Sequence, residues 1–255
     1  MKIATWNVNS LKVRLPQVLD WLAASRPDIL CLQETKLTDE NFPVAEIAAA
    51  GFNVVYAGQK TYNGVAVISR KPAAKVVTDV PGLEDTQRRV LGATIDGIRV
   101  LNLYVVNGQE VGSEKYDHKL HWLDKVSGYV GKQLRQHDRF VVLGDFNIAP
   151  EDRDVYDPEA WRERILCSTP ERDALRKMLD LGLIDTFRLF AQGESRFSWW
   201  DYRAAAFRRN MGLRIDLILA SRALAGSCTA CTIDVAPRKL ERPSDHAPVI
   251  AEFDI

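Results

Sequence analysis

The sequence has few cysteines. Four occur among 255 residues, at positions 31, 167, 228 and 231, a frequency that fits a reducing compartment better than a disulfide-rich secreted scaffold. Cys228 and Cys231 form a C-x-x-C, but no second C-x-x-C completes a zinc site. The segment SCTACTIDV has the pattern of a strand, in which residues three apart face opposite ways. We therefore interpret these cysteines as structural.

Long apolar runs and a charge imbalance are also absent. No run of about 18 apolar residues could cross a membrane, and the N-terminal MKIATWNVNSL lacks the apolar core of a signal peptide. Lys plus Arg and Asp plus Glu are equal at 34 each. Net charge therefore indicates no polyanionic partner, although basic residues can still gather on one face. We expect a cytoplasmic protein that does not bind membranes.

No internal repeat, low-complexity segment or linker interrupts the chain. With 46% hydrophobic residues, its length is sufficient for one large core. We predict a single domain over residues 1–255 and expect a monomer.

Strand candidates outnumber helix candidates. Apolar residues at helical spacing mark residues 11–22, 120–130 and 175–179. Apolar or alternating segments predict strands at residues 2–7, 28–33, 52–58, 64–70, 89–95, 98–106, 139–145, 213–219 and 247–253. Because these strands often follow one another directly, two packed mixed sheets with outer helices explain the order better than a doubly wound sheet. We predict a four-layer α/β sandwich.

Polar residues gather where the predicted strands end. They are Glu34 after DILCLQ, Asp145 and Asn147 after FVVLG, Asp216 within GLRID, and Asp245 and His246 before the last strand. A sheet holds its strand ends rigidly, as a metal or catalytic site requires. Taken singly, Asp145 fits a helix cap or turn, Asp245 a turn and His246 a buried histidine about as well. Their joint occurrence favours a site.

Two further strands end in polar residues. TWNVNSL adds Asn7 and Asn9, and NLYVVNG adds Tyr104 and Asn107, although turn asparagines and a half-buried tyrosine are common. The ordered set TWNVNSL, LQETK, YNGVAVISR, NLYVVNG, LGDFN, GLRIDLIL and SDHAPV closely resembles the exonuclease III family of DNA-repair nucleases. That family lies within the wider endonuclease/exonuclease/phosphatase superfamily. The matches span the chain almost from end to end.

The resemblance implies a fold, a cofactor and a substrate. The fold is a DNase I-like four-layer α/β sandwich, the cofactor is Mg²⁺ or Mn²⁺, and the reaction is hydrolysis of DNA phosphodiesters. Members of the family remove nucleotides or blocking groups from 3′ ends, with 3′-to-5′ exonuclease activity on duplex DNA, and many incise abasic sites. The expected partner is therefore double-stranded DNA with 3′ ends, nicks or abasic sites.

The resemblance also assigns residues by motif. It places the metal among Asn7, Glu34, Asp145, Asn147, Asp245 and His246. It puts Asp145 and Asn147 at the attacking water and the phosphate, pairs Asp216 with His246, and makes Tyr104 a phenol on the phosphate side.

Phosphodiester hydrolysis requires these residue types independently. An anionic phosphodiester repels nucleophiles, so a hard cation held by carboxylate and amide oxygens must neutralise the developing charge. Water, with a pKa of about 15.7, needs activation, and Asp145 is the natural base. An imidazole oriented by Asp216 can donate to a phosphoryl oxygen. Tyr104 can donate as well, or ionise if a metal lowers its pKa.

The segment SWWDYRAAAFRRNMGLR, residues 198–214, interleaves aromatic residues with arginines. We expect Trp199 to stack on a sugar or base, and arginines to contact phosphates; these are Arg203, Arg208, Arg209 and Arg214. The alternative is a solvated basic loop over buried tryptophans. The resemblance favours a DNA-inserting loop with Trp199 lining the abasic pocket and Leu213 where some relatives carry tryptophan.

Further DNA contacts are expected outside this segment. Lys60, Tyr62 and Asn63 in GQKTYNGVA form a candidate contact loop, Arg88 belongs to a basic pair in TQRRV, and Asn107 ends a strand. An exposed turn and a solvated strand edge explain the first two groups nearly as well.

Residues 155–175 bear on whether the protein incises abasic sites or only processes 3′ ends. VYDPEAWRERILCSTPERDAL puts Trp161, Leu166 or Cys167 near the substrate, where a bulky side chain would block an extrahelical abasic sugar and leave 3′ end processing intact. A non-DNA phosphoesterase of the same superfamily is less favoured, because no amphipathic membrane segment occurs. An inactive DNA-binding module is also less favoured, because every position that the chemistry requires is filled.

Overall fold

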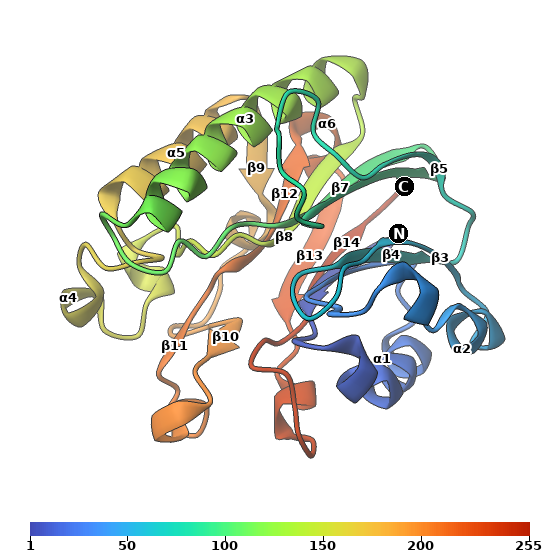
Figure 1. Cartoon of the computed structure of the whole chain (residues 1–255), viewed down its shortest axis with the longest axis horizontal. Coiled ribbons are helices and arrows are strands. Elements are labelled where there is room, and N and C mark those ends of the chain that lie inside the picture. Colours follow the sequence, from blue (N-terminus) through green and yellow to red (C-terminus); the bar gives the residue numbers. More distant parts are fainter.

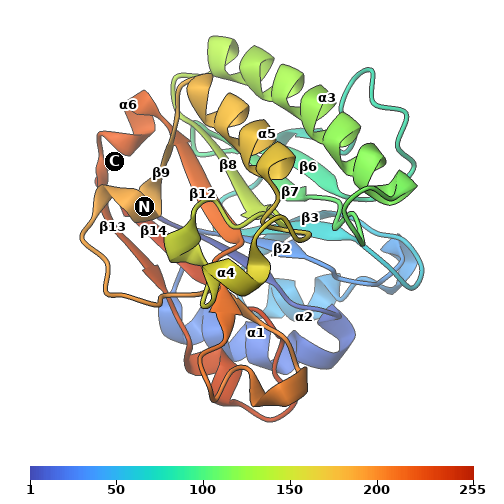
Figure 2. The same ribbon diagram turned by 90° about the vertical axis from the view of Figure 1, so that its left-hand side faces the viewer.

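Two six-stranded sheets face each other, and helices cover the outer face of each (Figure 1). The computed structural model describes residues 1–255. Helices α1 (Leu11–Ser25) and α2 (Val44–Ala49) lie outside the first sheet, and α3 (Glu114–Gln136) and α5 (Thr169–Asp180) lie side by side outside the second (Figure 2). The predicted four-layer α/β sandwich is confirmed.

The first sheet brings the two ends of the chain together. Its strand order is β13-β14-β1-β2-β4-β3, and only β1 and β2 are parallel. The strands are β1 (Lys2–Asn7), β2 (Ile29–Gln33), β3 (Asn53–Ala57), β4 (Val65–Ser69), β13 (Cys228–Ile233) and β14 (Val249–Phe253). Because β1 pairs with β14, the N-terminal strand is anchored by the last one.

The second sheet has the order β5-β6-β7-β8-β12-β9, and only β7 and β8 are parallel. Its strands are β5 (Ala74–Val77), β6 (Val90–Ile95), β7 (Ile98–Tyr104), β8 (Phe140–Asp145), β9 (Leu183–Asp185) and β12 (Asp216–Ser221). A separate antiparallel pair, β10 (Trp199–Trp200) with β11 (Gly212–Leu213), projects beyond the sheets (Figure 1).

Short helical segments fill the connections. They are α4 (Pro158–Trp161) and α6 (Arg222–Ala225), and the 3₁₀ turns η1 (Asp39–Asn41), η2 (Asp152–Asp154), η3 (Thr186–Leu189), η4 (Arg203–Ala205) and η5 (Ala236–Lys239). None of the helices combines the length and the apolar character that a membrane crossing needs.

All nine predicted strands and the three predicted helices are present, and the SCTACTIDV segment forms β13. The elements that the sequence did not reveal are short. Strands β5 and β9 have four and three residues at the edges of their sheet, too few for a period-two pattern to emerge.

Successive side chains along each strand point to opposite faces of its sheet, and this alternation produces separate layers of buried residues. Inward-facing residues of both sheets, among them Ile3, Cys31 and Leu143, form one cluster of 27 buried residues between the sheets. The intervening residues point outward, so that Trp6 packs in the cluster that includes the α1 residues Leu11 and Val18, and others pack beneath α3 and α5. This is the packing that period-two strands between helices require.

At one end of the space between the sheets, the inward-facing residues change from apolar to polar. Ile3 is followed by Thr5 and Asn7 in β1, and Cys31 by Gln33 in β2. The second sheet does the same: its polar inward-facing residues are Asn102 and Tyr104 in β7, Asp145 in β8 and Asp216 in β12. Two sheets therefore deliver polar side chains to one place.

A buried hydrogen-bond network joins the sheets just behind this end. Gln33 Nε2 donates to Thr5 Oγ1 at 2.8 Å and to Asn102 Oδ1 of the other sheet at 2.7 Å. Asn102 Nδ2 donates back to the main-chain oxygens of Leu32, at 2.9 Å, and Ala66, at 3.0 Å. Because these groups are fully buried, the bonds they make fix how one sheet sits on the other.

Close approach of β7 and β8 gives a test of this arrangement. Gly144 has φ +141°, and a Cβ atom there would lie 1.9 Å from the carbonyl oxygen of Leu103. We expect Gly144→Ala to lower the free energy of unfolding by more than about 3 kcal/mol, because the strand pair must separate. In Gly131→Ala, within α3, the added Cβ meets its nearest atom at 3.7 Å, and a gain of about 0.5–1 kcal/mol is expected. Equal effects in urea unfolding would contradict the account.

Candidate active site

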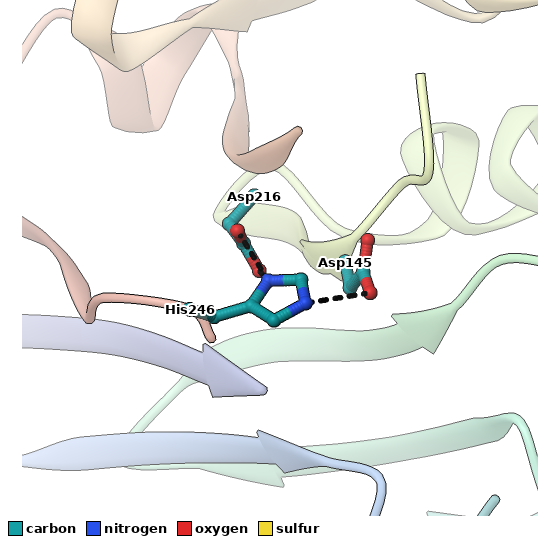
Figure 3. Close-up of side chains that lie close together, drawn as sticks. All are labelled: Asp145, Asp216 and His246. Carbon is teal, nitrogen blue, oxygen red and sulfur yellow. Dashed lines mark hydrogen bonds and ion pairs between the residues drawn. The ribbon is translucent and has the colours of Figure 1, made fainter. Parts of the chain in front are cut away.

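His246 lies between two buried carboxylates, Asp216 and Asp145 (Figure 3). Its Nδ1 is 2.9 Å from Asp216 Oδ2 and 3.1 Å from Oδ1, and its Nε2 is 3.8 Å from Asp145 Oδ2. The strand pairing produces this proximity, because Asp216 and Asp145 are direct partners in the register of β12 and β8. The Asp216 contact makes Nδ1 the donor, and Nε2 faces Asp145.

The charges in this group are coupled. Burial disfavours the charged imidazolium, but the carboxylates of Asp216 and Asp145 outweigh it and raise the pKa of His246 to about 10. Burial also raises the pKa of Asp145, while the charge of His246 opposes that rise. A protonated imidazole between two carboxylates is therefore the state that this arrangement favours, and it can donate to a phosphoryl oxygen.

Glu34 is held on the opposite side by three donors. Asn7 Nδ2 donates to Glu34 Oε1 and to Asp145 Oδ2, both at 2.9 Å, and the Tyr104 hydroxyl donates to Glu34 Oε1 at 2.9 Å. Lys36 Nζ lies 2.8 Å from Glu34 Oε2. The pKa of Glu34 is lowered because Lys36 and Asn7 outweigh the effect of burial. The carboxylate is thus ionised and fixed.

Tyr104 is held as a neutral donor. Burial, followed by the negative charges of Glu34 and Asp145, raises the pKa of the phenol well above its ordinary value, and the charge of Arg89 only partly opposes this. The guanidinium of Arg89 lies over the ring, 4.7 Å from its centroid. Of the two roles that the sequence left open, hydrogen-bond donation is the one that these surroundings favour.

Asn9 links this group to Asp245. Its Nδ2 donates to Asp245 Oδ1 at 2.9 Å, and Lys36 Nζ donates to its Oδ1 at 2.6 Å. Trp199 Nε1 donates to the other oxygen of Asp245 at 3.0 Å. Lys36, which no sequence pattern singled out, therefore contacts both Glu34 and Asn9. Its position two residues after Glu34 in LQETK was the available signal.

Asp145 makes the turn contact that the sequence suggested and also faces the candidate site. Its Oδ1 accepts the main-chain N–H of Asn147 at 2.9 Å, which is the turn expected of an aspartate, while Oδ2 faces Asn7 and His246. Asn147 Oδ1 accepts from Asn107 Nδ2 at 3.1 Å, and its Nδ2 donates to the Val105 oxygen at 3.0 Å. The amides of the two loops that follow β7 and β8 are thus joined.

The backbone is strained at two residues of the candidate site. Glu34 and Asn147 have φ of 52° and 49°, in the left-handed region that glycine favours. Each such residue costs about 1–3 kcal/mol and is retained where the surroundings enforce it, commonly at functional sites.

The donor set fits a hard divalent cation. Four carboxylates, from Glu34, Asp145, Asp216 and Asp245, interact with His246, and Lys36 is a second cation that contacts one of them. Oxygen ligands in excess of positive charge are what Mg²⁺ or Mn²⁺ requires. Ligating atoms of Asp145, Asp216 and His246 lie within 4.8 Å of one another. Asp216 is occupied by Nδ1 of His246. Glu34, Asp145 and Asp245 stay the carboxylate ligands that the sequence predicts.

Three predicted ligands are oriented for other contacts. Asn7 Oδ1 accepts the main-chain N–H of Asn9 at 3.0 Å, so its nitrogen, which cannot bind a metal, faces the carboxylates. Both amide atoms of Asn147 are likewise engaged, and His246 has only Nε2 free. These contacts position the three residues, and their assignment as metal ligands stays a prediction.

The aromatic and arginine segment is divided between surface and core. Arg203, Arg208 and Arg209 are exposed, as the DNA-contact interpretation needs, although Arg203 pairs with Asp201. Arg214 contradicts the expectation: its side chain is 1% exposed and pairs with Asp154 and Asp185. Leu213 is also fully buried, so it cannot contact DNA directly.

Beneath the half-buried Trp199 lies a small apolar cluster. Leu213 packs there with Leu166 and Cys167, and Trp161 packs at its side. The residues suspected of shaping an abasic pocket therefore meet behind Trp199, and Leu166 and Cys167 are themselves buried.

The second contact loop is also only partly exposed. Lys60 and Tyr62 are exposed, the latter at 68%. Asn63 is buried and donates its amide to Gln87, so it shapes the loop rather than presenting a free contact. Arg88 is half-buried and lies 3.4 Å from Asp79.

The fold and the site together define a metal-assisted hydrolase class, and the chain belongs to the Endonuclease/Exonuclease/phosphatase family, whose pattern matches residues 4–246. The prediction of a phosphodiester hydrolase of this family is confirmed. The chain is 35% identical to "Exodeoxyribonuclease III" of Haemophilus influenzae, covering 99% of this chain and all of that one.

Solved structures agree along the whole chain. NExo from Neisseria is 50% identical, covers both chains completely and has a TM-score of 0.98; it is described as a 3′-5′ exonuclease and as a 3′ phosphatase bound to product DNA hairpin. An AP endonuclease from Archaeoglobus fulgidus is 40% identical, with full coverage of both chains and a TM-score of 0.96.

Binding of Mn²⁺ without DNA tests the proposed ligands. Glu34→Gln keeps the size of the side chain but removes a charged oxygen ligand, so we expect the Mn²⁺ dissociation constant, measured by electron paramagnetic resonance, to rise at least about tenfold. The matched control is Glu252→Gln, whose side chain is 50% exposed at a surface ion pair. Unchanged affinity in Glu34→Gln would remove Glu34 from the ligand set.

Proposed function

We propose that this protein is a metal-dependent DNA-repair nuclease of the exonuclease III type, which removes nucleotides and blocking groups from the 3′ ends of duplex DNA. The observation that carries the proposal is His246 held by Asp216 beside Asp145, with Glu34 fixed on the other side by Asn7 and Tyr104. The full-length similarity to exodeoxyribonuclease III and NExo supports DNA as the substrate.

The side chains divide the chemistry among them. Asp145 takes a proton from the attacking water through Oδ2, while Oδ1 is held by the Asn147 N–H. The water oxygen bonds to phosphorus, the bond from phosphorus to the 3′ oxygen breaks, and the departing 3′ oxygen takes a proton from water to leave as a hydroxyl. His246 donates to a phosphoryl oxygen through Nε2, with Nδ1 fixed by Asp216. Asn147 orients the phosphate as a neutral donor, and Tyr104 holds Glu34 through its hydroxyl.

A divalent cation bound at the site would neutralise the charge of the phosphate. We propose that Mg²⁺ or Mn²⁺ is held by Glu34, Asp145 and Asp245, because these carboxylates are ionisable oxygen donors at one end of the site. We expect the protein to act as a monomer in the cytoplasm. Its expected substrate is duplex DNA with nicks or 3′ ends.

The exposed arginines on the β10–β11 segment are proposed DNA contacts. Arg208 and Arg209 are exposed on the same segment as Trp199. Trp199 Nε1 donates to Asp245 Oδ2 at 3.0 Å, which connects this segment to the site. A chain of zero net charge can bind DNA through such a local patch. Phosphate contacts would then position the duplex, and Trp199 would stack against the substrate nucleotide.

Incision at abasic sites is a second candidate activity. The 40% identity to an AP endonuclease over the full chain favours it. Because Leu166, Cys167 and Leu213 are buried behind Trp199, the partly buried Trp161 and Trp199 are the members of this cluster that would line a pocket for the abasic sugar. End processing requires no extrahelical sugar and is therefore the activity that we place first.

One set of duplexes separates these possibilities. A 3′-phosphate nick, an unmodified duplex end and an abasic duplex are incubated with protein, with and without Mg²⁺, and the products are resolved on a gel. We expect removal of the 3′ phosphate and shortening of the end only with Mg²⁺. Cleavage of none of these substrates, combined with hydrolysis of a soluble phosphoester, would contradict the proposed function.

A further inference from the structure

A fully buried ion pair lies behind the site, between Lys119 of α3 and Glu171 in the first turn of α5. Both side chains are 0% exposed. Buried ionic groups are costly to desolvate, and replacing such a pair by apolar residues is often neutral or stabilising. Stability alone therefore does not explain the pair, and its contacts indicate a further role.

Every proton of the Lys119 ammonium has an acceptor. Besides Glu171, Nζ donates to the main-chain oxygen of Asn147 at 2.7 Å and to that of Asn107 at 3.1 Å. These are the two residues whose side-chain amides are bonded to each other at 3.1 Å. Lys119 thus holds both loops at the two residues whose side-chain amides are joined.

Glu171 is equally saturated. Its Oε1 accepts from Lys119 and from the Leu166 N–H at 3.1 Å, and its Oε2 accepts from the Ser168 N–H at 3.1 Å and the Ser168 hydroxyl at 2.6 Å. The Ser168 hydroxyl also contacts the Tyr116 hydroxyl of α3 at 2.7 Å. The pair therefore connects the two amide-bearing loops to the segment that ends at Leu166 and Ser168.

The space around Lys119 is fitted to this purpose. Gly108, next to Asn107, has φ +89°, and a Cβ atom there would lie 3.0 Å from both Lys119 Cδ and Ile165 Cδ1. The chain after β7 therefore passes directly over the lysine stem. An apolar residue at position 119 could fill this space, but it would leave the carbonyl oxygens of Asn107 and Asn147 without this donor.

We propose that Lys119 and Glu171 are positioning residues for catalysis: they fix Asn107 and Asn147 against the reacting phosphate and tie them to residues 166–168. The inference rests on the proposed function, because it concerns the same phosphate. Displacement of a reacting or orienting group by about 1 Å can lower a rate about 100-fold, so anchoring of these loops has a measurable catalytic value.

The test compares Lys119→Met, Glu171→Gln and the double variant by single-turnover rate and KM on a 3′-phosphate nicked duplex, and by melting temperature. Lys119→Met should lose about 100-fold in rate with little change in KM, and it should melt earlier, because Glu171 is left unpaired. Glu171→Gln should lose rate in the same direction. The control Lys125→Met, exposed on the same helix, should match the wild type.

The double variant separates positioning from stability. Removing both charges should restore much of the melting temperature but not the rate, because the Asn107 and Asn147 carbonyls still lack their donor. Lys119→Met added to Asn147→Ala should cost little further rate, since the lysine acts through that residue. Recovery of rate together with stability, or multiplicative losses, would overturn the inference. Failure of the wild type to cleave the nick would instead contradict the proposed function.

Discussion

The change from apolar to polar along the inward faces of two packed sheets is the constraint on which this structure depends. Strands from both sheets run out of the common core at the same end, so Asn7, Tyr104, Asp145 and Asp216 point into one space without any loop having to place them. The Gln33–Asn102 bond joins the sheets immediately behind. Sliding one sheet over the other would break that buried bond before it could separate the two halves of the site.

That arrangement concentrates negative charge, which is unfavourable for folding and useful for chemistry. Buried carboxylates repel one another, and the protein offsets this with His246, Lys36 and the Asn7 amide, each of which contacts a carboxylate. The remaining deficit of positive charge suits a divalent cation. Left-handed backbone at Glu34 and Asn147 adds strain at the same place. The polar end of the core therefore lowers the stability of the fold but holds the site residues in fixed positions. The apolar remainder of the core stabilises the sheets that carry these residues.

Local pattern predicted the sheets and most of the site, and it failed where contacts come from distant parts of the chain. Asp145 and His246 were visible as polar residues beside apolar strands. Arg214 looked like a DNA contact because it ends a segment in which arginines alternate with aromatic residues, but its partners Asp154 and Asp185 come from other elements. Lys119 was overlooked although it lies three and four residues before the buried Trp122 and Leu123, on the apolar face of α3. A lysine at such a position is a signal for a buried ion pair. Short edge strands had no detectable periodicity.

The most direct measurement of the central claim is the single-turnover rate of Asp145→Asn on a 3′-phosphate nicked duplex at saturating Mg²⁺, with the DNA dissociation constant and melting temperature taken on the same sample. The substitution keeps the size of the side chain and one acceptor oxygen for the Asn147 N–H but removes the base beside His246. The account predicts a rate lower by about two to four orders of magnitude, with DNA binding retained and the fold intact. A folded, DNA-binding Asp145→Asn protein that cleaves at nearly the wild-type rate would contradict it.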